Sequence, residues 1–152
     1  MLRTIVFFLT LALAAVAQQV PAEMKYDPHA DPNVPLKAAL FQAGRERKNV
    51  LMDVGGEWCS WCHRMDKFLT ENAALLALLQ KNYIVVKVNF SEEHKNEKFL
   101  SQYPKVAGYP HLFVLSSAGK LIVSKNTGEL EEGKGYNLAR FREFLEQYAP
   151  AR

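Results

Sequence analysis

The chain has 152 residues, of which 49% are hydrophobic and 23% charged, and its formal net charge at pH 7 is +3. This length and composition predict one globular domain built around a single core. The charge excess is small, and no basic run is interleaved with aromatic residues, so we do not expect a nucleic-acid partner.

The first 17 residues are predicted to be a signal peptide rather than part of the fold. Arg3 precedes an apolar run over residues 5–17 that is interrupted only by Thr10. This run is shorter than the about 20 residues that a membrane-spanning helix needs. Small residues at Ala15 and Ala17 fit cleavage near Ala17. We therefore expect export to the periplasm or the extracellular space, with an uncleaved membrane anchor as the alternative.

Residues 18–34 contain three prolines and are expected to form an extended leader, laid over the domain or left mobile. The domain itself is expected over 35–152. In chain order, the hydrophobic spacing predicts a helix over 35–47, a strand over 50–54, helices over 60–69 and 72–79, a strand over 83–89, a helix over 93–102, strands over 111–115 and 121–124, and a helix over 138–148. This order predicts an α/β fold with a central mixed sheet flanked by helices.

The two cysteines of the chain lie in the stretch Trp58-Cys59-Ser60-Trp61-Cys62-His63, between a predicted strand and a predicted helix. Cysteines at this spacing can close a disulfide within one helical turn and open it again. A structural disulfide would suit an exported protein, but a loop this short constrains the unfolded chain little. The pair therefore indicates redox chemistry. The same letters also match C-x-x-C-H, the attachment motif of a c-type haem.

Several features of the chain resemble the thioredoxin superfamily, and the likeness runs from about residue 35 to residue 148. The strand before the cysteines carries Asp53 in the place of a buried aspartate, and Lys87 lies in a strand that resembles the one facing it. The loop Val106-Ala107-Gly108-Tyr109-Pro110 resembles the loop that ends in a cis-proline opposite the cysteines. Two departures are the Ser60-Trp61 dipeptide between the cysteines and the bulky Tyr109 before the proline.

The resemblance and the physical chemistry of helix ends together assign roles to four catalytic residues. Unpaired N–H groups and the helix dipole favour a thiolate at Cys59, which is the expected nucleophile, and Cys62 would resolve the mixed disulfide. Asp53 is the expected proton acceptor for Cys62, held by an ion pair with Lys87. The alternative for Asp53 is that it only caps the turn before Gly55.

Substrate binding is expected at an aromatic and proline surface around the cysteines. Trp58 and Trp61 would form an apolar rim for protein substrates. Pro110, as a cis-proline, would present the backbone of Tyr109 to an extended substrate segment. His63 is expected to be a solvated residue of the first helical turn.

We therefore predict an exported thiol–disulfide oxidoreductase, a monomer without a cofactor or metal, that reduces or exchanges disulfides of other proteins. The reducing direction is favoured because Asp53, Lys87 and Trp58 resemble the reducing thioredoxins. A reductase in an oxidising space would need an electron donor, such as a membrane thiol transporter. Two alternatives use Cys59, Cys62 and His63 differently. One is a c-type haem electron carrier, and the other is a Cu(I)-binding protein, since Cu(I) prefers thiolates.

Overall fold

The computed structural model describes residues 25–151. The predicted signal peptide, its cleavage point near Ala17 and the first part of the leader lie outside these residues. The elements in chain order are α1 (Asn33–Glu46), β1 (Asn49–Gly55), α2 (Ser60–Glu71), α3 (Ala73–Asn82), β2 (Tyr83–Asn89), α4 (Glu97–Leu100), β3 (His111–Leu115), β4 (Leu121–Asn126), a 3-10 turn (Thr127–Leu130), β5 (Glu131–Glu132), β6 (Gly135–Tyr136) and α5 (Leu138–Gln147).

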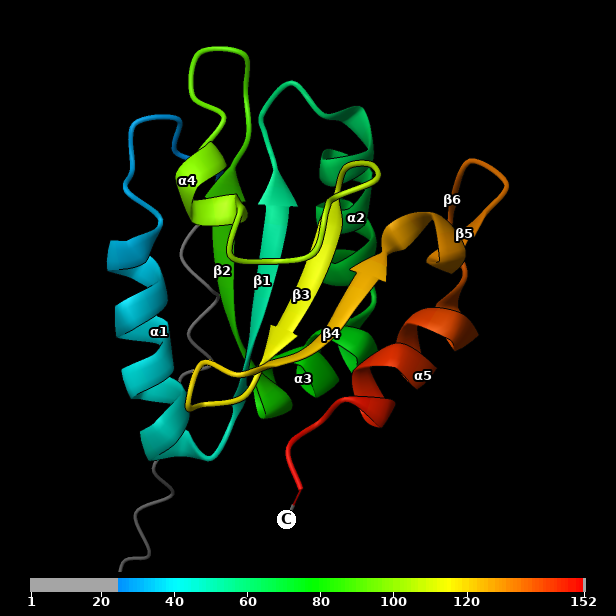
Figure 1. The fold of residues 1–152 in the computed structure, drawn as a ribbon. Helices are drawn as coiled ribbons and strands as arrows, with labels where there is room; N and C mark the ends of the chain where they lie inside the picture. Colours follow the sequence, from blue (N-terminus) through cyan, green and yellow to red (C-terminus); the bar gives the residue numbers. More distant parts are fainter. Residues whose placement is uncertain (1–24, 152) are drawn as a thin grey trace, which may run out of the picture.

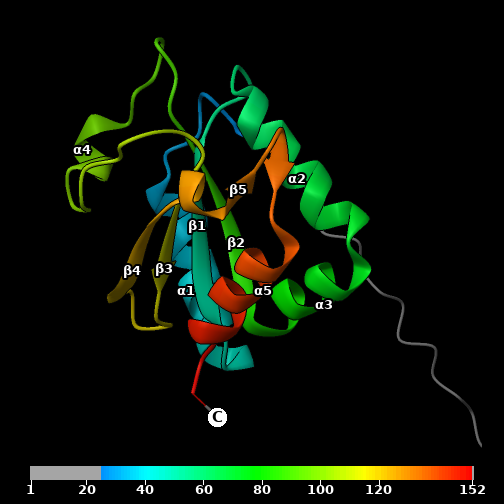
Figure 2. The same ribbon diagram turned by 90° about the vertical axis from the view of Figure 1, so that its right-hand side faces the viewer.

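Four strands form a mixed sheet in the order β2-β1-β3-β4 (Figure 1). β1 and β2 are parallel and are joined by α2 and α3, because a parallel pair needs a crossover connection. β3 is antiparallel to both β1 and β4. Figure 2 shows α2, α3 and α5 on one side of the sheet and α4 on the other. The predicted central mixed sheet flanked by helices is therefore confirmed.

The two faces of β1 contribute to two different apolar clusters. Val50, Met52 and Val54 belong to the cluster that contains residues of α1, whereas Leu51 belongs to the cluster that contains residues of α2, α3 and α5. All seven residues of β1 are buried, as expected for a central strand covered on both faces. Since side chains alternate along a strand, Asp53 shares the face of Leu51 and is turned toward α2.

The predicted helix over 93–102 is wrong, because only Glu97–Leu100 is helical. Ser91 and His94 bond each other's backbone N–H and carbonyl groups, both at 3.1 Å, in a tight turn. Asn96 adopts a left-handed φ of 50°, and its side chain donates to the Asn89 carbonyl at 2.7 Å. These local side-chain and turn bonds compete with the helical pattern that the sequence suggested.

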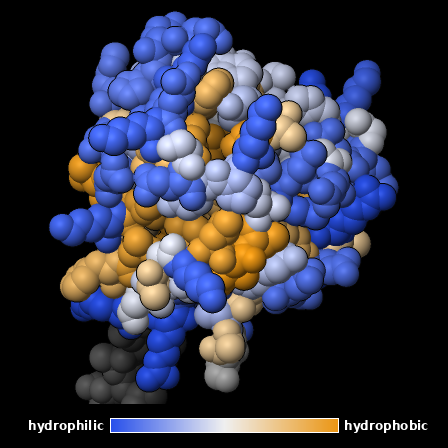
Figure 3. All heavy atoms as spheres, in the orientation of Figure 1, coloured by the Kyte–Doolittle hydropathy of each residue, from blue (hydrophilic) through white to orange (hydrophobic). Residues whose placement is uncertain are grey.

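The sheet face beside α1 and α4 is only partly covered, since the residues of β4 remain partly or fully exposed. Figure 3, drawn from the side of Figure 1, shows apolar atoms over the middle of this face and polar atoms around them. Ile122 of β4 is 44% exposed, and Val34 and Phe41 of α1 are 68% and 70% exposed.

Three smaller differences also separate the structure from the sequence prediction. α1 begins at Asn33, inside the stretch that was expected to be the leader. The 3-10 turn and the β5–β6 hairpin were not predicted. The helix predicted over 72–79 runs from Ala73 to Asn82, and the side chain of its N-cap residue Asn72 donates to the Phe68 carbonyl at 2.6 Å.

His111 is a buried titratable group at the start of β3, only 3% exposed. Its Nε2 lies 2.8 Å from Ser124 Oγ, and its ring centroid lies 4.7 Å from that of Phe113. Its Nδ1 has no hydrogen-bond partner among the described residues. Burial lowers the pKa of His111 below its ordinary value, so the ring is neutral in the folded protein at neutral pH.

We predict that the free energy of unfolding decreases as the pH falls below about 6.5, the ordinary histidine pKa. Below that pH the unfolded chain binds a proton that His111 in the folded protein takes up only at lower pH. The free energy of unfolding therefore decreases as the pH falls from about 6.5 to the folded-state pKa of His111. Denaturant unfolding at about pH 7.5 and about pH 5 measures this loss. The loss of stability between the two pH values should be smaller in His111→Gln. It should be unchanged in His29→Gln, which replaces an exposed histidine. An equal loss in His111→Gln and wild type would contradict the prediction.

Candidate active site

Cys59 and Cys62 form a disulfide at the beginning of α2, with their Cα atoms 5.2 Å apart. Cys59 is the N-cap residue of α2, and the Cys62 backbone N–H donates to its Sγ at 3.1 Å. The two residues are 3% and 0% exposed. The N–H groups at a helix start lack partners within the helix, so they stabilise negative charge on Cys59 Sγ once the disulfide is reduced.

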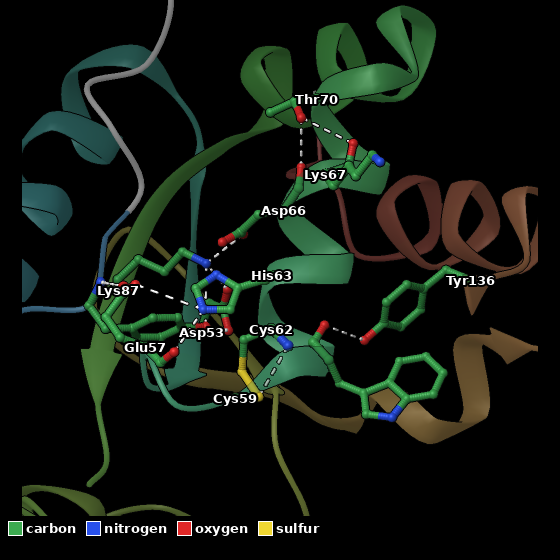
Figure 4. A network of polar contacts seen from close by, with 12 residues as sticks. Asp53, Glu57, Cys59, Cys62, His63, Asp66, Lys67, Thr70, Lys87 and Tyr136 are labelled. Atoms are coloured by element: carbon green, nitrogen blue, oxygen red, sulfur yellow. Dashed lines mark hydrogen bonds and ion pairs between the residues drawn. A yellow bond between two sulfur atoms is a disulfide. The ribbon is translucent and has the colours of Figure 1, made fainter. Parts of the chain in front are cut away.

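A buried group of charges lies beside the disulfide (Figure 4). Asp53 of β1 and Lys87 of β2 are direct partners in the strand register, which brings Lys87 Nζ to 2.6 Å from Asp53 Oδ2. Lys87 Nζ also lies 2.6 Å from Asp66 Oδ1 on α2. One ammonium group therefore bridges two carboxylates. Asp66 was not identified from the sequence.

The titration of this group follows from burial and from the neighbouring charges. Burial alone would lower the pKa of Lys87, but Asp53 and Asp66 outweigh it and hold that pKa above its ordinary value. Burial raises the pKa of Asp66, although Lys87 acts in the opposite direction. Lys87 is consequently a fixed cation at neutral pH, and it is not itself the group that gains and loses protons.

Tyr26, from the leader, completes the polar network and was also missed as a site residue. Its hydroxyl donates to Asp53 Oδ1 at 2.8 Å, and its backbone N–H donates to Glu57 Oε1 at 2.9 Å. Lys87 Nζ lies 4.4 Å from the centroid of the Tyr26 ring, a cation–π contact. The residue is 2% exposed. The part of the leader that the structure describes is thus laid over the domain.

Gly55, at the end of β1, allows the parts of the site to come close together. A Cβ at this position would lie 2.5 Å from Cys62 Sγ and 2.8 Å from the Tyr26 hydroxyl. Both distances are shorter than any side chain tolerates. The cysteine sulfur and the tyrosine hydroxyl therefore pack against the same bare backbone, and glycine is required there.

An aromatic surface borders the disulfide on one side. The Trp58 side chain is fixed by its Nε1, which donates to the Phe90 carbonyl at 2.6 Å, although the residue is 58% exposed. Tyr109 packs edge-on against Trp58 at 5.6 Å and stacks on Phe90 at 4.7 Å between ring centroids. Trp58 and Tyr109 are thus brought together beside the cysteines.

Trp61 occupies a different environment from Trp58. Its ring packs edge-on against Tyr136 at 5.6 Å, and the Arg64 guanidinium lies 4.8 Å from its centroid. It also contacts the cluster formed by Tyr26 and the two cysteines. Trp61 is therefore wedged between the disulfide and the β5–β6 hairpin, on the opposite flank from the aromatic surface of Trp58.

The Tyr109–Pro110 peptide bond is cis, and Pro110 directly precedes β3. The buried Thr127 hydroxyl donates to the Pro110 carbonyl at 2.6 Å, which ties this loop to the 3-10 turn. Thr127 is a supporting residue that the sequence did not reveal.

His63 lies on the outer side of the motif. Its Nε2 is 2.8 Å from the Glu57 carbonyl oxygen, and its side chain is 52% exposed. Within residues 25–151, no group of three or more His, Cys, Asp or Glu side chains is placed to hold a metal ion. In the same part of the chain, no helix has the length and apolar character needed to cross a membrane.

The fold and this paired-cysteine site define the class of thioredoxin-fold thiol–disulfide oxidoreductases. The chain belongs to the thioredoxin-like family, whose family model matches residues 32–117. The crystal structure of a disulphide isomerase from Xylella fastidiosa Temecula1 is similar, with 29% identity and a TM-score of 0.69. The match covers 86% of this chain and 98% of the Xylella fastidiosa chain. The predicted thioredoxin fold is therefore confirmed.

Two curated relatives are similar over shorter stretches. Disulfide bond reductase DsbH from Chlamydia pneumoniae is 26% identical over 91 residues, which cover 54% of this chain and 54% of the relative. An uncharacterised protein from Caenorhabditis elegans is 34% identical over 60 residues, which cover 40% of this chain and 8% of that protein. The chain thus spans about half or less of the length of these curated relatives.

We predict that Lys87→Met lowers the free energy of unfolding by about 3–5 kcal/mol, because two largely buried carboxylates lose their shared cation. Denaturant unfolding of the reduced and the oxidised protein measures the change. Lys67→Met is the matched control, since Lys67 pairs with Glu71 at 3.8 Å on an exposed helix face. That control should cost at most about 1 kcal/mol. Equal, small losses in both variants would show that the buried network does not stabilise the fold.

Proposed function

We propose that this protein is exported and reduces, or exchanges, disulfides of other proteins through the Cys59–Cys62 pair. The observation that supports this most directly is a disulfide at a helix N-terminus, next to the buried pair of Asp53 and Lys87. The name of the Chlamydia pneumoniae relative, a disulfide bond reductase, supports the reducing direction. The Xylella fastidiosa structure, a disulphide isomerase, supports exchange as the related activity.

In the proposed reaction, the Cys59 thiolate attacks a substrate disulfide and forms a mixed disulfide, releasing one substrate thiolate. Cys62 then attacks Cys59 Sγ, which re-forms the Cys59–Cys62 bond and releases the second substrate thiolate. The substrate gains two electrons and the protein pair loses them. Asp53 accepts the proton that Cys62 must lose before its attack.

Protein substrates are proposed to bind over the aromatic surface of Trp58 and Tyr109, with Trp61 on the other flank of the disulfide. Exposed aromatic rings suit contacts with many different partners because they bury a large apolar area. The backbone beside Pro110 would pair with an extended substrate segment as a short β-ladder.

The proposed cellular setting comes from the sequence. Residues 1–17 would be removed as a signal peptide after Ala17, leaving the leader over 18–34 and the domain over 35–152. The exported protein would then work in the periplasm or outside the cell. A reductase there needs a supply of electrons, for which we propose a membrane thiol protein as donor. We further propose that the protein works as a monomer.

The Cys59–Cys62 disulfide supports this function over the haem and copper alternatives, because both alternatives need the cysteine sulfurs to bind another group. Haem attachment would require both cysteine sulfurs to bond to the haem and His63 to ligate its iron. In the structure the two sulfurs bond each other, deep against Tyr26, Trp61 and Tyr109. His63 Nε2 contacts the Glu57 carbonyl oxygen instead. A covalent Soret band, or stoichiometric copper surviving dialysis, in the purified protein would overturn the proposal.

We predict that Cys62→Ser traps a mixed disulfide with a protein substrate such as insulin, whereas Cys59→Ser forms none. The reason is that Cys59 makes the first bond and Cys62 breaks it. Non-reducing electrophoresis and mass spectrometry measure the adduct. His63→Gln, which leaves both sulfurs in place, is the control and should reduce insulin at a rate close to wild type. Trapping by Cys59→Ser instead would reverse the assigned roles.

We also predict that the reduction potential of the Cys59–Cys62 pair lies nearer to the about −270 mV of thioredoxin than to the about −120 mV of a strong disulfide-forming oxidant. The reason is the resemblance of Asp53, Lys87 and Trp58 to the reducing thioredoxins. Equilibration with glutathione or with a second redox protein of known potential measures the value. A potential at the oxidising end would mean that the protein forms disulfides rather than reduces them.

A further inference from the structure

The leader contributes the buried side chain of Tyr26 to the interior of the site. Its backbone N–H is held by Glu57 Oε1 at 2.9 Å and its hydroxyl by Asp53 Oδ1 at 2.8 Å, so both ends of the residue are fixed. The residue is 2% exposed, so it is buried like the apolar core of the domain. A buried hydroxyl is costly unless it is hydrogen-bonded, so the Tyr26 hydroxyl depends on its bond to Asp53. An apolar ring would anchor the leader without that requirement.

The hydroxyl is close to both the Asp53 carboxylate and the resolving cysteine. It donates to Asp53. The Tyr26 hydroxyl and Cys62 Sγ also share the space beside Gly55, at 2.8 Å and 2.5 Å from the position that a Cβ would take. Tyr26, Cys59 and Cys62 also form one buried cluster. The tyrosine oxygen is thus a close neighbour of Cys62 Sγ and bonds directly to the proposed proton acceptor.

The charges around this hydroxyl favour a group that passes protons rather than one that keeps a charge. Lys87 Nζ donates to the Tyr26 oxygen at 3.3 Å. Asp53, Asp66 and Glu57 are the acidic groups that face it. Burial and these carboxylates raise the pKa of Tyr26 well above its ordinary value, so the phenol stays protonated at neutral pH.

We propose that the Tyr26 hydroxyl carries the proton from Cys62 to Asp53 during resolution of the mixed disulfide, an inference that rests on the proposed function. The Cys62 S–H bond breaks as the tyrosine oxygen accepts that proton, and the tyrosine's own proton moves to Asp53 Oδ1. The Cys62 thiolate then attacks Cys59 Sγ, and the substrate leaves as a thiolate that takes a proton from water. Tyr26 ends unchanged, Asp53 ends neutral, and the ammonium of Lys87 stays charged throughout.

The test is Tyr26→Phe, which keeps the ring and removes the hydroxyl. Single-turnover release of a substrate thiol from the mixed disulfide should slow about tenfold or more at neutral pH. The pH profile of that step should move to higher pH, because Cys62 must then ionise without the relay. The first attack by Cys59 should keep its rate.

Tyr83→Phe is the matched control. Tyr83 is an equally buried tyrosine, 2% exposed, and its hydroxyl donates to the Leu145 carbonyl at 2.8 Å, away from the cysteines. This variant loses a buried hydroxyl as well and should keep the wild-type rate and pH profile of resolution. If Tyr26→Phe keeps the same rate and pH profile of resolution as Tyr83→Phe, the Tyr26 hydroxyl has only a structural role and the relay is contradicted.

Coupling to Asp53 separates a relay from a packing effect. Tyr26→Phe should slow resolution in the wild-type background and add little in the Asp53→Asn background, since both changes interrupt one proton path. Equal slowing in both backgrounds would contradict the relay.

A measurement on the wild-type protein covers the case in which Tyr26→Phe does not fold. The rate of resolution in mixtures of H2O and D2O should depend quadratically on the deuterium fraction, because two protons move in the same step. A linear dependence would contradict the relay. If the wild-type protein forms no mixed disulfide with any disulfide substrate, the proposed function fails instead, which is a result distinct from all of these.

Discussion

The ammonium group of Lys87 is the point on which the arrangement of the site depends. Its side chain is 6% exposed, and it lies 2.6 Å from a carboxylate of β1 and 2.6 Å from a carboxylate of α2. A charge at this depth must be paired, because leaving it or its partners alone costs several kcal/mol. A one-residue slip between β1 and β2 would turn Lys87 to the other face of the sheet and break both contacts. The register of the sheet and the position of the cysteine-bearing helix are thus tied to one side chain.

The same constraint explains why the leader belongs to the site. The cluster carries two carboxylates for one ammonium, so Asp53 keeps an oxygen in need of a donor. The Tyr26 hydroxyl supplies that donor, and its ring lies against the Lys87 cation. Gly55 then brings the tyrosine oxygen and Cys62 Sγ against one stretch of bare backbone. Charge pairing, the leader and the disulfide are consequently parts of one buried structure.

The order of the main elements could be predicted from hydrophobic spacing, because β1, β2 and β3 are short apolar runs and the helices have a periodic apolar face. The prediction was wrong at 93–102, where the polar sequence fits a helix but the turn at Ser91–His94 and the left-handed Asn96 prevent one. The β5–β6 hairpin has two residues in each strand, too few to produce a periodic pattern. Hydrophobic spacing reveals the buried faces of long elements, whereas these short segments are held by a few local hydrogen bonds.

The sequence by itself determined the chemistry of the site: two cysteines one helical turn apart, an acidic residue in the preceding strand, and a lysine in a later one. Asp66 follows Cys62 by one helical turn, which was a signal that could have been read. Only the tertiary structure decided that Lys87 bridges two carboxylates and that Tyr26 closes over Asp53. These contacts join residues 34, 21 and 27 positions apart. They depend on strand register and on the path of the leader, which no local pattern of residues encodes.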